Sequence, residues 1–319
     1  MVNRQLLRVK TVQTLYSCFV SSGVTGDKME KQLIESVSQS GSLYYCMLQF
    51  MVDMRKYLNQ AALHSLSEDD PQSDPLYPIM SCRKFRDNRI SCILEKNEEL
   101  SEELENRGMM WTWEMHRDVM REIAISVSEQ EYFKKYAADD NESIEQDISL
   151  WCKIFENDVQ ASVLLDELLE EMSIFWNDDL QNAVAFVIKT IRRMRPDSIA
   201  TNPLIPILRD ASELDYAKRL LRYTLLHFSD ADERVRPLLK GWELSRLSVM
   251  DLTILRAAYG ELKTNSETHA GVIVNEYTEI AKGYCGDSNV PFISAVLYSL
   301  AKNVRPLEVK NKPTKNDKK

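Results

Sequence analysis

Apolar residues recur every three or four positions along most of this chain, which is the period of an amphipathic α-helix. The first segment, residues 2–20, carries one apolar stripe at that spacing, at Leu6, Val9, Val12, Tyr16 and Phe19. The strict alternation of apolar and polar residues that marks a half-buried β-strand persists almost nowhere. The pattern therefore predicts an all-α protein.

Turn-forming residues interrupt the helical pattern. Gly41 is expected to end one helix before another begins, and residues 67–78, dense in acids and prolines, predict an exposed loop. Pro196, Pro203 and Pro206 predict a stiff connector and a boundary. The helices expected before the last quarter of the chain span residues 27–38, 42–65, 85–105, 111–137, 143–173 and 178–195. Helical patterning resumes over 212–240, where a polar turn near Ser229 interrupts it.

The last quarter carries good signals for three helices. Ser248 and Asp251 have the spacing of a capping box at a helix start. Gly286 is expected to close the next helix. Asn289 and Pro291 suit the N-cap and the first turn of the final helix.

The composition agrees with a helical globular chain. Its 319 residues predict two domains or one large one, and it has only 9 Gly and 10 Pro. The longest apolar run, residues 183–188, is far shorter than the roughly 20 residues that a membrane helix needs, so no membrane association is expected. The first ten residues lack the apolar region of a secretory signal, which predicts a cytoplasmic location, although their lack of acids would also suit a transit peptide.

Motifs that would carry catalysis or bind a metal are missing from the sequence. The six cysteines form no C-x-x-C pair and the four histidines stand alone, so we expect reduced thiols and no metal. No Walker loop, nucleophile elbow, dinucleotide fingerprint or H-E-x-x-H helix occurs. We therefore expect no catalytic residue, no cofactor and no enzyme.

The acidic clusters can be interpreted as helix starts and solvated faces or as functional sites, and the first interpretation is favoured. Asp139-Asp140 and Asp178-Asp179 precede apolar helical runs, where the helix macrodipole favours carboxylates. This makes them helix starts rather than an acid–base pair or a Mg²⁺ site. The run from Glu95 to Glu105 has six carboxylates and one cation, which favours a solvated helix face over an acidic docking surface.

Two basic clusters stand out against the net charge of −9. Arg4 and Arg8 lie one turn apart on the first helix and are expected to share an exposed face, with no acid among residues 1–20. A second cluster, from Lys189 to Arg195, lies at a helix C-terminus, where the dipole favours cations without any ligand. Each is either an ordinary exposed face or a local anion-binding patch.

Groups of residues at the two ends of the chain have the order and spacing of a known family. They are Arg4 and Arg8 with Val12-Gln13-Thr14-Leu15-Tyr16-Ser17, then Met250-Asp251-Leu252-Thr253-Ile254-Leu255-Arg256, Tyr259-Gly260-Glu261-Leu262, Val274-Asn275-Glu276, Ala281-Lys282, Phe292 and Val296-Leu297. Over about residues 1–20 and 213–303 the chain resembles the NusB transcription antitermination factors. The enlarged middle is similar to that of longer family members, such as those of Bacteroidetes.

The resemblance implies a fold of two three-helix bundles set across each other, here with a large additional helical region. It also implies a non-enzymatic role within the RNA polymerase antitermination complex: binding boxA RNA of nascent ribosomal transcripts together with the NusE ribosomal protein. The family's RNA contacts fall on Arg4, Arg8, Tyr16 and Phe292 of this chain. Arginines contact phosphates and aromatic rings stack on unpaired bases, although Tyr16 and Phe292 would also suit a core.

This chain departs from the family pattern in two places. Gln5 and Leu6 stand where compact members often carry arginines, and Phe292-Ile293-Ser294-Ala295 replaces Phe-Val-Asn-Gly. These departures favour a rival hypothesis, a helical protein-docking scaffold without significant RNA affinity. An RNA-modifying enzyme is a third hypothesis, disfavoured by the lack of a nucleotide-binding pattern. Asn275 and Glu276 are expected to be architectural.

The expected organisation has four parts. They are the first helix of the NusB-like core at 1–20, a helical insertion or enlarged N-terminal bundle at 21–210, the rest of the core at 211–303 and a disordered basic tail at 304–319. We expect the insertion to pack against the first bundle and to add a protein-contact surface. Its apolar stripes would otherwise be exposed, most clearly that of Leu180, Val184, Val187, Ile191 and Met194.

Overall fold

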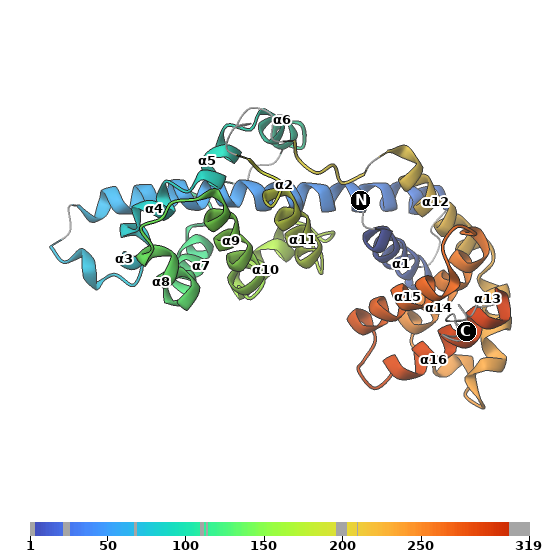
Figure 1. The fold of residues 1–319 in the computed structure, drawn as a ribbon. Coiled ribbons are helices and arrows are strands. Elements are labelled where there is room, and N and C mark those ends of the chain that lie inside the picture. Colours follow the sequence, from blue (N-terminus) through green and yellow to red (C-terminus); the bar gives the residue numbers. More distant parts are fainter. Residues whose placement is uncertain are drawn as a thin grey trace, which may run out of the picture. The chain divides into compact units, whose positions relative to one another are not determined.

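The structure, a computed structural model, describes residues 4–21, 26–66, 69–108, 112, 114–195, 203–208 and 210–305. Regular structure in these ranges is helical throughout, and they contain no strand (Figure 1). The chain divides into two compact units: unit 1 comprises Met1–Val37 and Leu208–Lys319, and unit 2 comprises Ser38–Ile207. The prediction of an all-α protein is confirmed.

Unit 1 is arranged around α14 (Val249–Thr264), which packs against α1, α12, α13, α15 and α16. The first turns of α2 also belong to this unit, because Met29, Leu33 and Val37 are part of its core. The helices concerned are α1 (Arg4–Val20), α2 (Gly26–Ser65), α12 (Ala211–Leu226), α13 (Phe228–Val235), α15 (Ala270–Tyr284) and α16 (Val290–Val304), with 3₁₀ segments at Arg236–Leu239 and Leu244–Arg246.

Unit 2 is built around the rest of α2. Most residues between positions 43 and 58 are buried on every face of this helix, as expected when protein surrounds it. Figure 1 shows the other helices of the unit on both sides of α2. They are α3 (Tyr77–Ser81), α4 (Arg83–Arg86), α5 (Arg89–Glu95), α6 (Glu98–Asn106), α7 (Arg117–Glu129), α8 (Glu131–Ala138), α9 (Ile144–Ile154), α10 (Val163–Met172) and α11 (Leu180–Ile191), with a 3₁₀ turn at Pro71–Ser73 and a π-helical turn at Phe155–Val159.

Helix α2 continues without a break through Gly41, so the prediction that this glycine ends a helix was wrong. A Cβ atom at Gly41 would lie 3.2 Å from Cγ1 of Ile207 and 3.4 Å from Nη1 of Arg107. The missing side chain therefore permits a close approach of neighbouring segments to the helix. Glycine costs a helix about 1 kcal/mol relative to alanine, and the burial along the rest of α2 offsets this cost.

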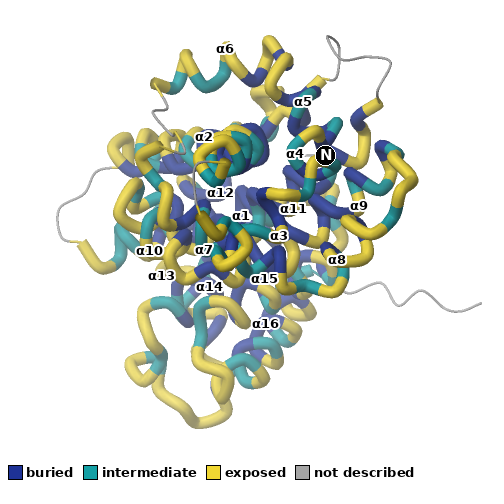
Figure 2. The backbone as a smooth tube through the Cα atoms, turned by 90° about the vertical axis from the view of Figure 1, so that its left-hand side faces the viewer, coloured by how far each residue is buried: buried dark blue, intermediate teal, exposed yellow. Residues whose placement is uncertain are grey.

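The predicted helix over residues 85–105 is divided by two asparagines. Asn88 accepts hydrogen bonds from the backbone N–H groups of Ile90 and Ser91, which starts α5. Asn97 accepts one from the N–H of Leu100, which starts α6. The periodicity of the sequence did not predict either helix start, because the apolar spacing continues across both asparagines. Most acidic residues of α6 are exposed, in agreement with the predicted solvated face (Figure 2).

The predicted helices over 111–137 and 143–173 are also divided. The first becomes α7 and α8, separated at Gln130, and the second becomes α9, the π-helical turn and α10. The buried carboxylate of Asp158 lies in this turn and accepts hydrogen bonds from Ser126, Gln130 and Tyr132. The turn thus aims a polar group inward, where several donors satisfy it.

The start of α11 lies where Asp178-Asp179 predicted it. Asp179 is the N-cap residue, and its buried carboxylate accepts a hydrogen bond from Ser40 Oγ at 2.5 Å. The predicted apolar stripe of this helix is buried, which confirms that it packs, at Leu180, Val184, Val187, Ile191 and Met194. Beside it, Nη2 of Arg192 lies 3.9 Å from Glu156 Oε1.

The helix-start signals of the last quarter are confirmed. Ser248 and Asp251 form both hydrogen bonds of a capping box, and Asn289 with Pro291 begins α16. No described helix is long and apolar enough to cross a membrane. The predicted tail lies outside the described residues from position 306 onward.

The expected insertion at 21–210 differs from unit 2 at its N-terminal side. Residues 26–37 begin α2 but contribute to the core of unit 1, because their apolar residues pack there. Docking of the insertion onto the first bundle stays a prediction.

Gly260 of α14 lies against α12, and a Cβ atom there would be 2.4 Å from Oγ1 of Thr224. We expect Gly260→Ala to lower the free energy of unfolding by about 1–3 kcal/mol through overpacking. Urea denaturation followed by circular dichroism measures this change.

Two matched variants test the cause. Gly283 of α15 has no atom within 4 Å of its Cβ position, so Gly283→Ala should leave stability unchanged or raise it by up to about 1 kcal/mol. Adding Thr224→Ala to Gly260→Ala removes the clashing oxygen and should restore most of the loss. A double variant no more stable than Gly260→Ala would contradict the assigned clash.

Candidate nucleic-acid interface

Helix α1 presents few of its cations to solvent. Arg4 is exposed, whereas Arg8 is 2% exposed and Lys10 is fully buried. The prediction that Arg4 and Arg8 share an exposed face was therefore wrong for Arg8. Residues four apart on a helix differ by about 40° in direction, which here separates the edge of the helix from its buried side.

Arg8 forms a buried ion pair with Glu261 of α14. Its Nε donates to Oε2 at 2.8 Å and its Nη2 donates to Oε1 at 2.7 Å, so the contact is bidentate. Arg8 Nη1 donates to Oε2 of Glu276 on α15 at 3.0 Å. Asn265 donates to Glu261 Oε1 at 3.1 Å. One guanidinium thus joins three helices of unit 1.

The surroundings keep these charges in place. Burial by itself would lower the pKa of Arg8, but the hydrogen bonds and charge of Glu261 raise this pKa above its usual value. Burial, followed by the nearby Glu261 charge, raises the pKa values of Tyr216 and Tyr277 above the ordinary tyrosine value. Both phenols are therefore neutral at physiological pH. Arg8 is committed to packing rather than to a ligand.

Glu261 and Glu276 are the sequence features that indicate a buried partner for Arg8. Both carboxylates lie on the apolar helices of the family motifs, and Glu261 is fully buried. A buried carboxylate needs a cationic partner, and the first helix provides arginines but no acids. The expectation that Glu276 is architectural agrees with its contact to Arg8, whereas Asn275 is exposed.

Arg4 borders a shallow hollow of about 250 Å³ in unit 1. Its Nη1 donates to Oγ1 of Thr268 at 3.1 Å, and its guanidinium lies 5.5 Å from the ring centre of Tyr216. Among the described residues that line the hollow, Arg219 is the other cation, and two carboxylates, Glu213 and Glu267, also line it. The charges of these residues are therefore balanced around Arg4.

Tyr16 and Phe292 lie in different settings. Tyr16 is 38% exposed and is about 18 Å from Arg4 along α1, from the rise of 1.5 Å per residue. Phe292 is partly buried at the start of α16, with its ring centre 5.8 Å from that of Trp242. The structure thus does not gather the four predicted site residues into one cluster.

Phe292 belongs instead to an exposed aromatic cluster, which consists of Trp242, Arg246 and Phe292. Trp242 is 55% exposed, and the guanidinium of Arg246 lies 5.2 Å from its ring centre. Lys240 and Gly241 have φ angles of 48° and 93°, which make the tight turn that presents Trp242. This arrangement combines a stacking platform with a cation, as in sites for single-stranded nucleic acid.

Trp242 and Arg246 were not predicted as site residues. The sequence does indicate Trp242, because it directly follows Lys240-Gly241. A tryptophan beside a turn glycine lies outside a helix and has few neighbouring side chains that could bury it, so an exposed ring is expected. Helical periodicity says nothing about such a loop.

Arg256, from the same family motif as Met250, has a structural role. It forms a bidentate ion pair with Asp232, at 2.8 and 2.7 Å, and lies 4.6 Å from the ring centre of Phe19. This contact joins α1, α13 and α14. Among the described residues there is no group of three or more metal-ligating side chains, and all six cysteines are free thiols.

Residues 183–302 match the NusB family, and this match covers less than half of the chain. The matched region includes α12 to α16 and begins within α11 of unit 2. The resemblance is confirmed for this part of the sequence. Helix α1 lies outside the matched residues, although it packs in the same core as α14.

Curated relatives support this assignment. The transcription antitermination protein NusB of Clostridium botulinum strain Hall is 39% identical over 85 residues, which are 27% of this chain and 59% of that protein. The protein of the same name from Helicobacter hepaticus is 42% identical over 89 residues, or 28% and 56%. That of Clostridium tetani is 36% identical over 95 residues, or 30% and 62%. The chain thus spans about three fifths of the length of the curated relatives it matches, and no solved structure matches it.

Arg8→Met should lower the free energy of unfolding of unit 1 by about 3–5 kcal/mol, because it leaves Glu261 buried without its cation. Arg4→Met removes an exposed cation from the same helix and should change stability by about 0.5 kcal/mol or less. Chemical denaturation of the intact chain, followed at probes in α14, measures both.

Two further variants separate charge from packing. Glu276→Gln should cost less than Arg8→Met, because the Glu276 side chain is 30% exposed and solvent replaces part of its interaction. Adding Glu261→Met to Arg8→Met removes the orphaned charge and should recover part of the loss. Equal effects of Arg4→Met and Arg8→Met would sink the assigned role of the ion pair.

Proposed function

We propose that this chain is a non-enzymatic transcription antitermination factor of the cytoplasm. In this proposal it binds boxA-type single-stranded RNA of nascent ribosomal RNA transcripts, together with the NusE ribosomal protein, within the RNA polymerase antitermination complex. The observation that carries the proposal is the NusB match over residues 183–302, with relatives 36–42% identical in this region.

The proposed RNA surface draws on separate places in unit 1: Arg4 and Tyr16 on α1, and the aromatic cluster Trp242, Arg246 and Phe292. Arg8 is not part of it, because its guanidinium is buried between two carboxylates. With few exposed cations, affinity rests more on base stacking than on phosphate contacts. Stacking on an aromatic side chain contributes about 1–3 kcal/mol per base, so this surface suits a short single strand.

The rival function is a helical protein-docking scaffold without significant RNA affinity. The buried state of Arg8 and Lys10 favours it, because α1 then carries one exposed cation among the described residues. The exposed aromatic cluster favours RNA binding over this rival, although an aromatic surface also suits a protein partner. A direct measurement with RNA separates the two.

Trp242→Ala and Phe292→Ala should each weaken binding of fluorescently labelled boxA RNA by about 1–3 kcal/mol, through the loss of stacking. Anisotropy titration, with and without the NusE ribosomal protein, measures the affinity. Tyr298→Ala is the matched control, because Tyr298 is 55% exposed on the same helix as Phe292 but about 120° away around its axis. Its RNA affinity should equal that of the unmodified chain.

Salt dependence tests the cationic part of the surface. If Arg4 and Arg246 each contact a phosphate, replacing both by glutamine should flatten the slope of log K against log salt by roughly 1.4, from about 0.7 per contact. An unchanged slope removes these residues from the RNA surface. A chain that binds the ribosomal partner but no boxA RNA under any of these conditions would be the scaffold instead.

A further inference from the structure

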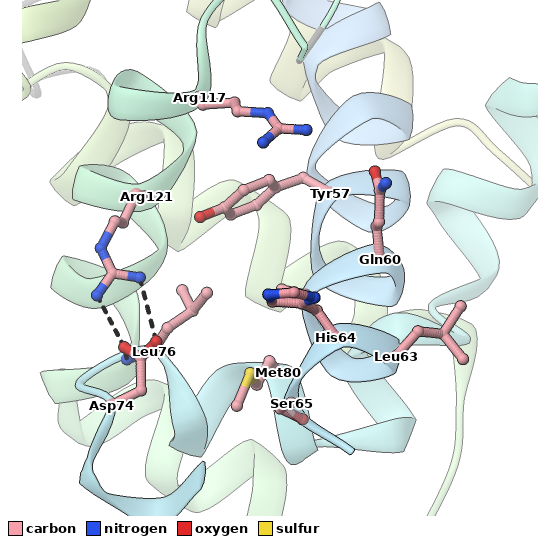
Figure 3. A pocket seen from close by; sticks show the side chains of 11 residues that line it. Tyr57, Gln60, Leu63, His64, Ser65, Asp74, Leu76, Met80, Arg117 and Arg121 are labelled. Carbon is pink, nitrogen blue, oxygen red and sulfur yellow. Dashed lines mark hydrogen bonds and ion pairs between the residues drawn. The ribbon is translucent and has the colours of Figure 1, made fainter. Parts of the chain in front are cut away.

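Unit 2 contains a pocket of about 600 Å³, outside the NusB-matched residues. Its walls come from the C-terminal part of α2, from α3 and the segment before it, and from the first turns of α7 (Figure 3). The volume lies in the range of about 300–1,000 Å³ that holds small organic ligands in proteins. Structural packing alone does not require such a space.

The pocket is basic although the protein is acidic. Among the described residues that line it, Arg117 and Arg121 are cationic and Asp74 is the carboxylate, with the imidazole of His64 beside them. The chain as a whole carries a net charge of −9. Two arginines against the carboxylate of Asp74 leave one excess positive charge among these residues, and this charge favours an anion there.

One arginine of the pocket already holds a carboxylate. Arg121 Nη2 donates to Oδ1 of Asp74 at 2.8 Å, and Nη1 donates to Oδ2 at 3.4 Å. The hydrogen bonds from Arg121 lower the pKa of Asp74, so Asp74 is ionised at neutral pH. The ion pair holds the Arg121 side chain in one orientation. It also shows that a carboxylate can bind at this wall of the pocket.

Arg117 is the first residue of α7 and lies one turn before Arg121. Its side chain lies above the ring of Tyr57 of α2, whereas the guanidinium of Arg121 points to Asp74 (Figure 3).

The remaining walls are apolar. Leu76 and Met80 are buried below the ring of Tyr57, whereas Leu63, also in the lining, is 69% exposed. An exposed large apolar side chain in the wall of a cavity is typical of a ligand site.

We propose that this pocket binds a small organic anion with an apolar body. Its carboxylate, sulfonate or phosphate group lies near Arg117 and His64, and its body lies against Leu63, Leu76 and Met80. The site is independent of the proposed RNA surface, because its residues belong to unit 2.

The probe 8-anilinonaphthalene-1-sulfonate combines an anion with an apolar body and fluoresces when bound away from water. Titrated into the intact folded chain, it should bind saturably. Arg117→Gln should raise its Kd about tenfold, the effect of losing one charge-assisted hydrogen bond. Ala61→Phe, which fills space in the lining of α2 without changing charge, should also abolish the saturable phase.

Arg83→Gln is the matched control, because it removes an 86% exposed arginine of the same unit that does not line the pocket. Its Kd should be unchanged. Circular dichroism confirms that each variant is folded. Saturable binding that survives both Arg117→Gln and Ala61→Phe, or that Arg83→Gln weakens equally, would overturn the site, as would a lack of saturable binding.

Competition separates the two chemical requirements. Benzoate should displace the probe, whereas benzyl alcohol, which keeps the ring without the charge, should displace it at least about tenfold less well. Equal displacement by benzyl alcohol would refute the need for an anion. Displacement by inorganic phosphate at the same concentration as benzoate would refute the need for an apolar body.

Discussion

Unit 1 depends on one buried ion pair. Arg8 and Glu261 are separated by more than 250 positions in the chain, and neither charge is stable away from water without the other. Glu276 and Asn265 complete the network from α15 and from the end of α14. Two apolar residues of similar volume would serve packing alone, whereas the bidentate contact joins the apolar residues Leu7, Val12 and Leu15 in favouring one face of α1 against α14.

The same pair determines what the surface can do. A guanidinium held by two carboxylates inside the core is not available to a phosphate, so the positive charge of α1 is weaker outside than its composition indicates. The side chains of unit 1 that suit a stacked ligand are then those around Trp242, whose ring has the Arg246 guanidinium and the Phe292 ring as neighbours. This kind of surface recognises flat, unpaired groups better than a regular duplex backbone.

The sequence predicted the helices best where period and cap agree, as at α14 with Ser248 and Asp251. The prediction of helix boundaries failed where one residue type can serve two structural roles. Gly41 was expected to stop a helix but permits close packing inside one, and Asn88 and Asn97 start helices within an unbroken apolar spacing. The site was harder to predict, because the direction of Arg8 is decided by Glu261, and no local pattern contains both residues.

The close approach at Gly41 also bears on how a large segment can interrupt a smaller fold. Gly41 and Ile207 lie near the two points where the chain enters and leaves unit 2, and they are in near contact. Tyr44 accepts a hydrogen bond from the backbone N–H of Ile205 at the same place. The first and last residues of Ser38–Ile207, a segment of 170 residues, therefore lie close together.

This closeness affects the entropy of folding. For unit 1 the folded insertion acts as a short loop, whereas an unfolded insertion would carry the entropic cost of closing a loop of its full length. During synthesis, at about 5–20 residues per second, α1 waits roughly 10–35 s while unit 2 is made. Folding of unit 2 in that interval would bring the two halves of unit 1 within reach of each other.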